Sequence, residues 1–209
     1  MTIRLCVFDA YGTLFDVSAA ARAAARGPAD PAQEALAARW PEVAALWRRK
    51  QLEYSWLRAV TGAHADFWQV TCDALDWTLE AEGLRDVPGL RGRLLDLYHE
   101  LGAYPEVTGV LARLRAAGLG TAILSNGAPA MLEAAVRAAG LEDALDAVLS
   151  VEEVGVFKPA RAVYDMVEAG FGIAPPEVLF VSANGWDAAA ATGHGFRTVW
   201  INRDSAPVE

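Results

Sequence analysis

The sequence predicts an α/β fold in which a doubly wound, parallel, Rossmann-like sheet carries an inserted helical cap. From residue 102 onward, short apolar runs alternate with stretches of helical periodicity, the order expected of strand, helix, strand units in a parallel sheet. Residues 17–101 differ, because they are rich in alanine, helical in pattern, and hold five of the seven tryptophans. We therefore expect residues 1–16 and 102–209 to form the core and residues 17–101 the cap.

The first apolar run, residues 3–8, predicts a buried strand. This strand would carry Asp9 to the carboxyl end of the sheet, where open α/β folds bind their ligands. Gly118 and Gly140 are placed to end the helices before and after the second strand. Further strands are expected at residues 120–124, 147–150, 178–181 and 198–201, and core helices at residues 105–117, 129–139 and 159–169.

A long cap helix is predicted to begin at Pro41, since proline is favoured at the first helical position. Glycine and proline interrupt the region at residues 27–31 and 87–89. A helical module inserted after the first strand would cover the carboxyl ends of the sheet and exclude water from Asp9. The long helix carries a broad apolar stripe made of Val43, Leu46, Trp47, Tyr54 and Leu57.

Composition argues against several classes of function. The net charge of -9 disfavours nucleic-acid binding, because phosphate neutralisation needs a basic face. No apolar stretch approaches the roughly 20 residues of a spanning helix, so no membrane partner is expected. The amino terminus has no signal-peptide layout, which indicates a cytoplasmic protein. The two cysteines, Cys6 and Cys72, are expected to stay unpaired.

Polar side chains follow the apolar runs at what we take to be four strand ends. In a parallel sheet such ends converge at one edge, so residues far apart in sequence become neighbours. A carboxylate nucleophile needs a cation that holds it ionised and donors that orient it. Asp9 is the candidate nucleophile and Lys158 the candidate cation. The candidate site residues from these strand ends are Asp9, Thr13, Ser125, Asn126, Lys158, Ser182, Asn184 and Asp187.

Each of these residues also has a simpler interpretation when taken singly. A lysine before a proline is commonly a solvated loop residue, and a Ser-Asn-Gly segment is commonly only a turn. Asp16 or Asp187 alone could equally cap the helix that follows it. Their joint occurrence, in order along the chain, favours a site.

Several motifs resemble the (S)-2-haloacid dehalogenases of the haloacid dehalogenase superfamily over nearly the whole chain. The opening segment, residues 8–17, fits the superfamily's first motif, and residues 46–57 are similar to the cap-helix signature of the dehalogenases. Tyr11 stands where many superfamily phosphatases have a second aspartate, which argues for the dehalogenase branch. The other matching segments are residues 124–127, 157–159 with Tyr164, 180–187 and 200–203.

The resemblance implies a fold with a haloacid dehalogenase-like core and a covalent mechanism. Asp9 would attack the α-carbon of an (S)-2-haloalkanoic acid with inversion and form an ester. Arg48, on the cap, would meet the departing halide, with Asn126 as a second donor. Water activated by Asp187 would then release the (R)-2-hydroxy acid. The residues that would hold these carboxylates in place are Lys158, Ser182, Asn184 and Thr13.

The resemblance also implies how the substrate is bound. Ser125 and the backbone N–H groups of Ala10 and Tyr11 would bind its carboxylate. The remaining substrate contacts would be Phe67 and Trp186, as apolar walls, and Tyr164.

No cofactor and no metal are expected. Superfamily phosphatases hold Mg²⁺ with acids in the final motif, where this chain has Ser182 and Asn184. The expected partners are a small 2-haloacid, halide and a second copy of the chain in a homodimer. Two alternatives stay open at this point, a phosphatase acting on a small phosphate ester and a catalytically silent binding module.

Overall fold

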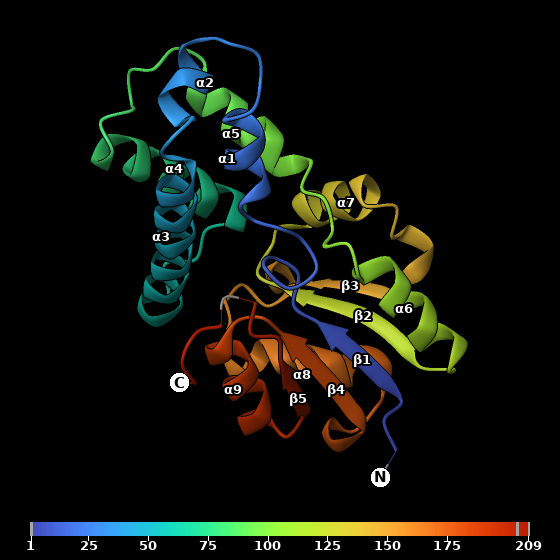
Figure 1. Ribbon diagram of the computed structural model, residues 1–209. Coiled ribbons are helices and arrows are strands. Elements are labelled where there is room, and N and C mark those ends of the chain that lie inside the picture. Colours follow the sequence, from blue (N-terminus) through green and yellow to red (C-terminus); the bar gives the residue numbers. More distant parts are fainter. Residues whose placement is uncertain (1, 204, 209) are drawn as a thin grey trace.

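A five-stranded parallel sheet forms the centre of the molecule in a computed structural model, which describes residues 2–203 and 205–208. The strand order is β3-β2-β1-β4-β5, with β1 in the middle (Figure 1). This order confirms the predicted doubly wound sheet, because the chain moves outward from β1 in both directions. The strands are β1 (Leu5–Phe8), β2 (Gly120–Ser125), β3 (Ala147–Ser150), β4 (Val178–Ser182) and β5 (Arg197–Trp200).

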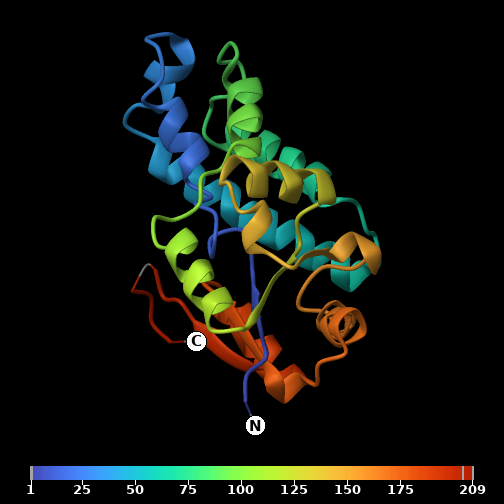
Figure 2. The same cartoon turned by 90° about the vertical axis from the view of Figure 1, so that its right-hand side faces the viewer.

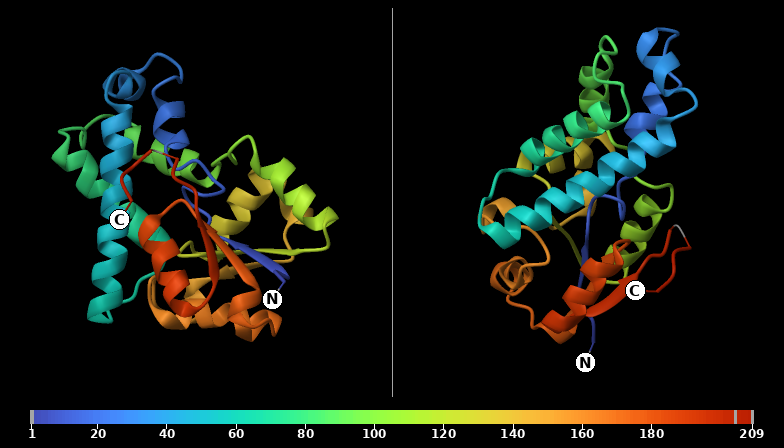
Figure 3. Two further views of the ribbon diagram at one scale, coloured as in Figure 1. Left: turned by 60° about the horizontal axis from the view of Figure 1, so that its bottom comes forward. Right: turned by 90° about the vertical axis from the view of Figure 1, so that its left-hand side faces the viewer.

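The central strand is apolar because helices cover both faces of the sheet. All four residues of β1 are buried, and Val7 lies between Ala122 of β2 and Phe180 of β4. The helices α6 (Val107–Ala116) and α7 (Pro129–Ala138) cover one face. The other face is covered by α8 (Arg161–Phe171) and α9 (Gly185–His194), as Figure 3 shows. Three short 3₁₀ helices, η1 (Glu142–Ala144), η2 (Val151–Glu153) and η3 (Pro175–Glu177), lie in the connections.

A layer of helices lies over the carboxyl ends of the strands (Figure 2). Its longest members, α3 (Trp40–Thr61) and α4 (Phe67–Ala81), pack against each other. Buried polar groups pair between them: the Trp47 indole donates to the Thr71 carbonyl at 2.9 Å, and Gln51 donates to the Thr71 hydroxyl at 3.0 Å. The other helices of this layer are α1 (Ala19–Ala24), α2 (Pro31–Leu36) and α5 (Leu90–His99).

Most element bounds differ from the predicted ones by only one or two residues. The helix predicted from residue 159 begins at Arg161 and runs on to Phe171, where Gly172 ends it with a left-handed backbone at φ 62°. The last strand begins and ends one residue earlier than predicted. Within the described part of the chain, none of the helices has the length and apolar character needed to span a membrane.

Candidate active site

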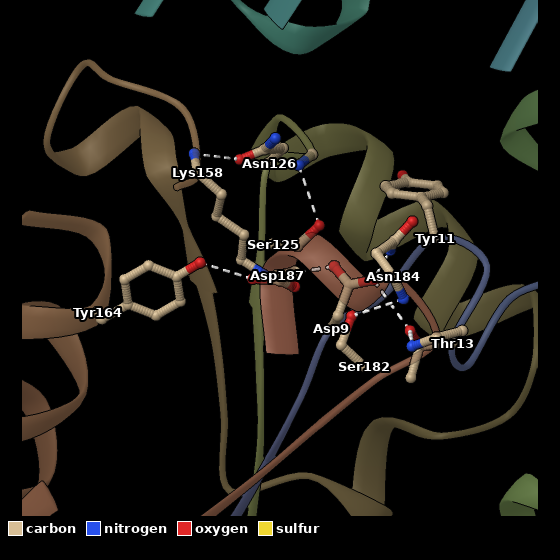
Figure 4. A network of polar contacts seen from close by, with 12 residues as sticks. Asp9, Tyr11, Thr13, Ser125, Asn126, Lys158, Tyr164, Ser182, Asn184 and Asp187 are labelled. Carbon is tan, nitrogen blue, oxygen red and sulfur yellow. Dashed lines mark hydrogen bonds and ion pairs between the residues drawn. The ribbon is translucent and has the colours of Figure 1, made fainter. Parts of the chain in front are cut away.

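Asp9 follows β1 directly and is almost completely buried. One carboxylate oxygen, Oδ2, accepts hydrogen bonds from the Thr13 hydroxyl and from the Asn184 side-chain amide, both at 2.9 Å. The other, Oδ1, lies 3.2 Å from Nζ of Lys158 (Figure 4). The carboxylate is therefore fixed in orientation and faces a cation, which are the two conditions for a nucleophilic aspartate.

A tight loop after β1 delivers Thr13 to this carboxylate. The Leu14 N–H donates to the Ala10 carbonyl at 2.8 Å, and Gly12 adopts a φ of 89°, which favours glycine. The Thr13 hydroxyl accepts from the Ala183 N–H at 2.8 Å while it donates to Asp9. Its single proton is thus directed at the nucleophile.

Lys158 is fully buried and joins two carboxylates. Its Nζ lies 2.9 Å from Asp187 Oδ2 as well as 3.2 Å from Asp9 Oδ1. Burial alone lowers the pKa of Lys158, but the charges of Asp187 and Asp9 outweigh it and raise the pKa above its usual value. The ammonium is therefore a permanent cation at neutral pH.

Asp187, in the first turn of α9, is completely buried. Its second oxygen, Oδ1, accepts from the Tyr164 hydroxyl at 2.7 Å. Burial raises the pKa of Asp187 above its usual value, and the charge of Lys158 opposes the shift. A carboxylate with a raised pKa is a stronger base, which suits proton abstraction from water.

A small pocket lies between the sheet edge and the helical layer. Two of its polar lining residues have their orientation set by neighbours. The Ser125 hydroxyl accepts from the Gly127 N–H at 3.0 Å, which leaves its proton free to donate. Asn126 accepts the Lys158 N–H at 2.9 Å through Oδ1, so its Nδ2 is the atom left to donate to a ligand. The lining consists of Asp9, Tyr11, Arg48, Leu52, Phe67, Ser125, Asn126, Lys158, Asn184 and Trp186.

Arg48 reaches this pocket from α3. Its Nη2 donates to the Tyr11 carbonyl at 3.2 Å and lies 3.5 Å from Asn184 Oδ1. Within residues 2–203 and 205–208 it has no carboxylate partner, so its positive charge is available to an anion. The neighbouring Arg49 is exposed and lines no part of the pocket.

Several known proteins that are similar to this chain are dehalogenases. The haloacid dehalogenase-like hydrolase family matches residues 3–195. The chain is 49% identical over 207 residues to (S)-2-haloacid dehalogenase 1 of Pseudomonas sp. (strain CBS-3), covering 99% of this chain and 88% of that protein. It is 46% identical to the (S)-2-haloacid dehalogenase of Xanthobacter autotrophicus over 96% of this chain and 76% of that protein. The chain belongs to the haloacid dehalogenase-like hydrolases. Within that family it groups with the (S)-2-haloacid dehalogenases.

A solved structure also shows the likeness in three dimensions. The L-2-haloacid dehalogenase of Xanthobacter autotrophicus with chloropropionic acid covalently bound superposes with a TM-score of 0.86 at 46% identity, covering 98% of this chain and 79% of that chain. A structure described as a dehalogenase superposes with a TM-score of 0.91 at 43% identity, over 99% of this chain and 88% of that chain.

In this haloacid dehalogenase-like hydrolase, two residues lie elsewhere than the sequence suggested. We expected Lys158 at a strand end, but it lies in the loop after η2, beyond the end of β3 at Ser150. We expected Tyr164 among the substrate contacts, but it lies behind Asp187 and does not line the pocket. Burial and the Asp187 charge raise the pKa of Tyr164, so it stays a phenol that donates to this carboxylate.

The remaining predicted residues lie around the Asp9 carboxylate. The Ser182 hydroxyl accepts from the backbone N–H of Asn184 at 3.1 Å and so helps to fix the turn that carries the Asn184 side chain. Among the backbone hydrogen bonds of the described residues, the N–H groups of Ala10 and Tyr11 have no acceptor, which leaves them for a ligand. A Cβ at Gly127 would stand 2.7 Å from the Tyr11 ring, so glycine is required there.

Sequence reasoning missed Arg203 as part of the hydrolase site. Its Nη2 donates to the Thr13 carbonyl at 2.7 Å and its Nε to the Gly12 carbonyl at 3.1 Å, which stiffens the loop that carries Thr13. The only signal was its place in the segment 200–203 that matches the family. In the described ranges, no group of three or more His, Cys, Asp or Glu side chains is placed to hold a metal ion.

Proposed function

We propose that the protein hydrolyses (S)-2-haloalkanoic acids to (R)-2-hydroxyalkanoic acids and halide through an ester on Asp9. One observation carries this proposal: the pocket places the carboxylate of Asp9, which faces Lys158, together with Arg48, a cation without a carboxylate partner in the described chain. Displacement of halide needs both groups, because the carboxylate acts as the nucleophile and the cation stabilises the halide that leaves. The relatives named above carry the same activity in their names.

In the first step, a carboxylate oxygen of Asp9 forms a bond to the α-carbon while the carbon–halogen bond breaks. The halide leaves with the bonding electron pair, and the configuration at the α-carbon inverts. Arg48 and the Asn126 amide donate to the halide as its charge develops. Donors placed where charge appears only in the transition state are what accelerates such a step.

The substrate carboxylate is held by neutral donors. The Ser125 hydroxyl and the N–H groups of Ala10 and Tyr11 converge near Asp9 without adding charge beside it. Phe67 and Trp186 provide the apolar walls of the pocket. This arrangement fixes the α-carbon for in-line attack.

In the second step, water attacks the acyl carbon of Asp9. Asp187 accepts a proton from that water, and the bond between the acyl carbon and the ester oxygen breaks. The ester oxygen, which came from Asp9, takes the proton from Asp187 as it leaves, so the hydroxy acid is released and both carboxylates are restored. Tyr164 and Lys158 hold Asp187 in position throughout.

Tyr11 speaks against phosphoryl transfer. Its ring is buried, 5.8 Å from the Tyr98 ring and 6.0 Å from the Phe67 ring, and its raised pKa keeps it neutral. It supplies no carboxylic acid to protonate a leaving alkoxide. The reaction we propose is independent of metal, since Lys158 already supplies a positive charge beside Asp9 and Asp187, and Ser182 and Asn184 stand where phosphatases use acids.

We also propose the division into a core of residues 1–16 and 102–209 and a cap of residues 17–101.

Exposed apolar side chains on the cap, Leu57 and Val60 on α3 and Trp77 on α4, support a homodimer formed through this surface. Light scattering on a sizing column should give twice the chain mass, and Val60→Glu should give the single-chain mass. The two unpaired thiols, Cys6 and Cys72, support a cytoplasmic location.

Halide release from (S)-2-chloropropionate tests the activity directly. The expected product is (R)-lactate by chiral chromatography, with no phosphate released from a panel of small phosphate esters. Phosphate release without halide release would favour the phosphatase alternative. Release of neither anion would favour the binding module.

A further inference from the structure

We propose that the halide leaves the closed pocket on the side of Arg48, through an open groove between the cap and the core. The inference rests on the proposed dehalogenation, which produces one halide per turnover. It concerns the exit route, not the halide contacts within the pocket.

The pocket is small and nearly closed, and the groove beside it is large. Its free volume is about 10 Å³, whereas the groove outside Arg48 has about 760 Å³. Arg48 lines both cavities, so its guanidinium forms part of the wall between them. A halide bound to Arg48 inside the pocket therefore needs only a rotation of this side chain to face the groove.

The opposite side of the boundary between cap and core is held shut by Glu152 of η2. Its carboxylate pairs with His64 Nε2 at 2.9 Å and accepts the Phe67 N–H at 3.3 Å. The His64 ring packs on Phe157 with centroids 4.8 Å apart, and Phe67 contacts the same ring. These contacts tie the first residues after α3 to the core.

The cavity outside that closed side repels anions. It has a volume of about 560 Å³, and its charged lining residues are Asp66 and Glu152. Two carboxylates at the exit would raise the energy of a passing halide. Both the packing and the charge therefore oppose release in this direction.

The groove beside Arg48 has the opposite charge. Arg22, Arg48 and Arg203 line it together with a single acid, Asp16, which gives a net charge of +2. Glu106, which pairs with Arg203, reduces the charge to +1 when it is included. In a chain with a net charge of -9 this is a local attraction for anions.

The two outer arginines pair with carboxylates, whereas Arg48 has no carboxylate partner among the described residues. Arg22 lies 2.6 Å from Asp16, and Arg203 lies 2.8 Å from Glu106. A halide that has left Arg48 for the outer part of the groove is consequently attracted by a moderate field and not trapped by a free cation. Weak attraction in an open groove favours release to solvent.

Ala45 offers a clean test, because it lines the groove, is exposed, and touches none of the pocket. Ala45→Phe should narrow the groove without changing the halide contacts. A change in route alters association and dissociation rates equally and leaves the equilibrium unchanged. Ala112→Phe, the same change at an exposed position on α6, is the matched control.

The probe is iodide, whose binding to the enzyme without substrate is followed by stopped-flow quenching of tryptophan fluorescence. Ala45→Phe should lower both rate constants by about fivefold or more with Kd within about twofold, and Ala112→Phe should change neither. Ala45→Glu should slow association and Ala45→Lys should speed it, with both effects weakening as salt is added.

Glu152→Gln tests whether the halide leaves on the opposite side, past Glu152. Faster iodide association in Glu152→Gln, together with wild-type rates in Ala45→Phe, would place the exit on the Glu152 side and overturn the proposal. A changed Kd in Ala45→Phe with unchanged dissociation would also overturn it, because the groove would then be a binding site and not a route. These measurements need no turnover, so a failure of the dehalogenase assignment would be seen separately in the halide-release assay.

Discussion

Nζ of Lys158 lies 2.9 Å from Oδ2 of Asp187, an ion pair from which solvent is excluded on both sides. The same ammonium lies 3.2 Å from Asp9. One buried cation thus serves the residue that forms the ester and the residue that directs its hydrolysis.

The first prediction concerns pH. Because the pKa of Lys158 is raised above the ordinary value of 10.5, the stabilisation from its ion pairs is fully present below that value and is lost as pH rises through the raised pKa. Urea unfolding should show the loss only in strongly alkaline solution. Lys158→Met should lack this alkaline loss and be less stable at neutral pH by about 3–5 kcal/mol, the cost of breaking a buried pair.

The second prediction traps the ester. Asp187→Asn should still displace halide once but hydrolyse the intermediate slowly, since the proton acceptor for water is gone. Intact-mass analysis after incubation with (S)-2-chloropropionate should show one carboxyethyl group, located in the peptide that contains Asp9.

Asp9→Asn is the control for this trap and should carry no adduct. In single turnover of the wild type in labelled water, the label should enter the Asp9 carboxylate. Label found only in the product, with no adduct in any variant, would mean that water attacks the substrate directly and that Asp9 is a general base.

The third prediction assigns Tyr164 to the second step. Tyr164→Phe removes the 2.7 Å hydrogen bond to Asp187 Oδ1 without changing the lining of the pocket. The rate of ester hydrolysis should fall about tenfold, equivalent to a hydrogen bond of about 1.4 kcal/mol, while substrate binding stays as in the wild type. A weaker substrate affinity with a normal rate of ester hydrolysis would instead support the original expectation that Tyr164 contacts the substrate.

The fourth prediction compares two adjacent arginines. Arg48→Ala should lower kcat/KM by about 10²–10³-fold with little change in Tm, because Arg48 meets charge that develops only as the halide departs. Arg49→Ala is the matched control, since Arg49 is exposed on the same helix and should retain activity. The reverse result would show that the other arginine faces the halide.

The fifth prediction concerns metal. Dialysis against a chelator should leave halide release unchanged, because Lys158 supplies the positive charge beside both carboxylates. Activity that is lost on dialysis and restored by Mg²⁺ would contradict the proposal and strengthen the phosphatase alternative.

The sequence by itself determined the sheet and the position of the nucleophile. Short apolar runs bounded by glycine and polar residues indicate strands in a chain of this alternation, and Asp9 directly follows the first of them. The insertion of the helical layer was also predictable, because alanine and tryptophan with helical periodicity stand apart from the strand pattern. These features depend on neighbours within a few residues.

Only the tertiary structure decided how the site residues divide their work. Lys158 and Asp9 are 149 positions apart, and no local pattern places the lysine, since it lies in a loop beyond β3. The resemblance implied that Tyr164 contacts the substrate, yet the packing of α8 directs its hydroxyl to Asp187. Arg48 and Arg49 are chemically equivalent in sequence, and the docking of α3 on the core determines which one enters the pocket. Periodicity specifies which face of an element is buried, whereas the partner of each polar group is set by how the elements pack.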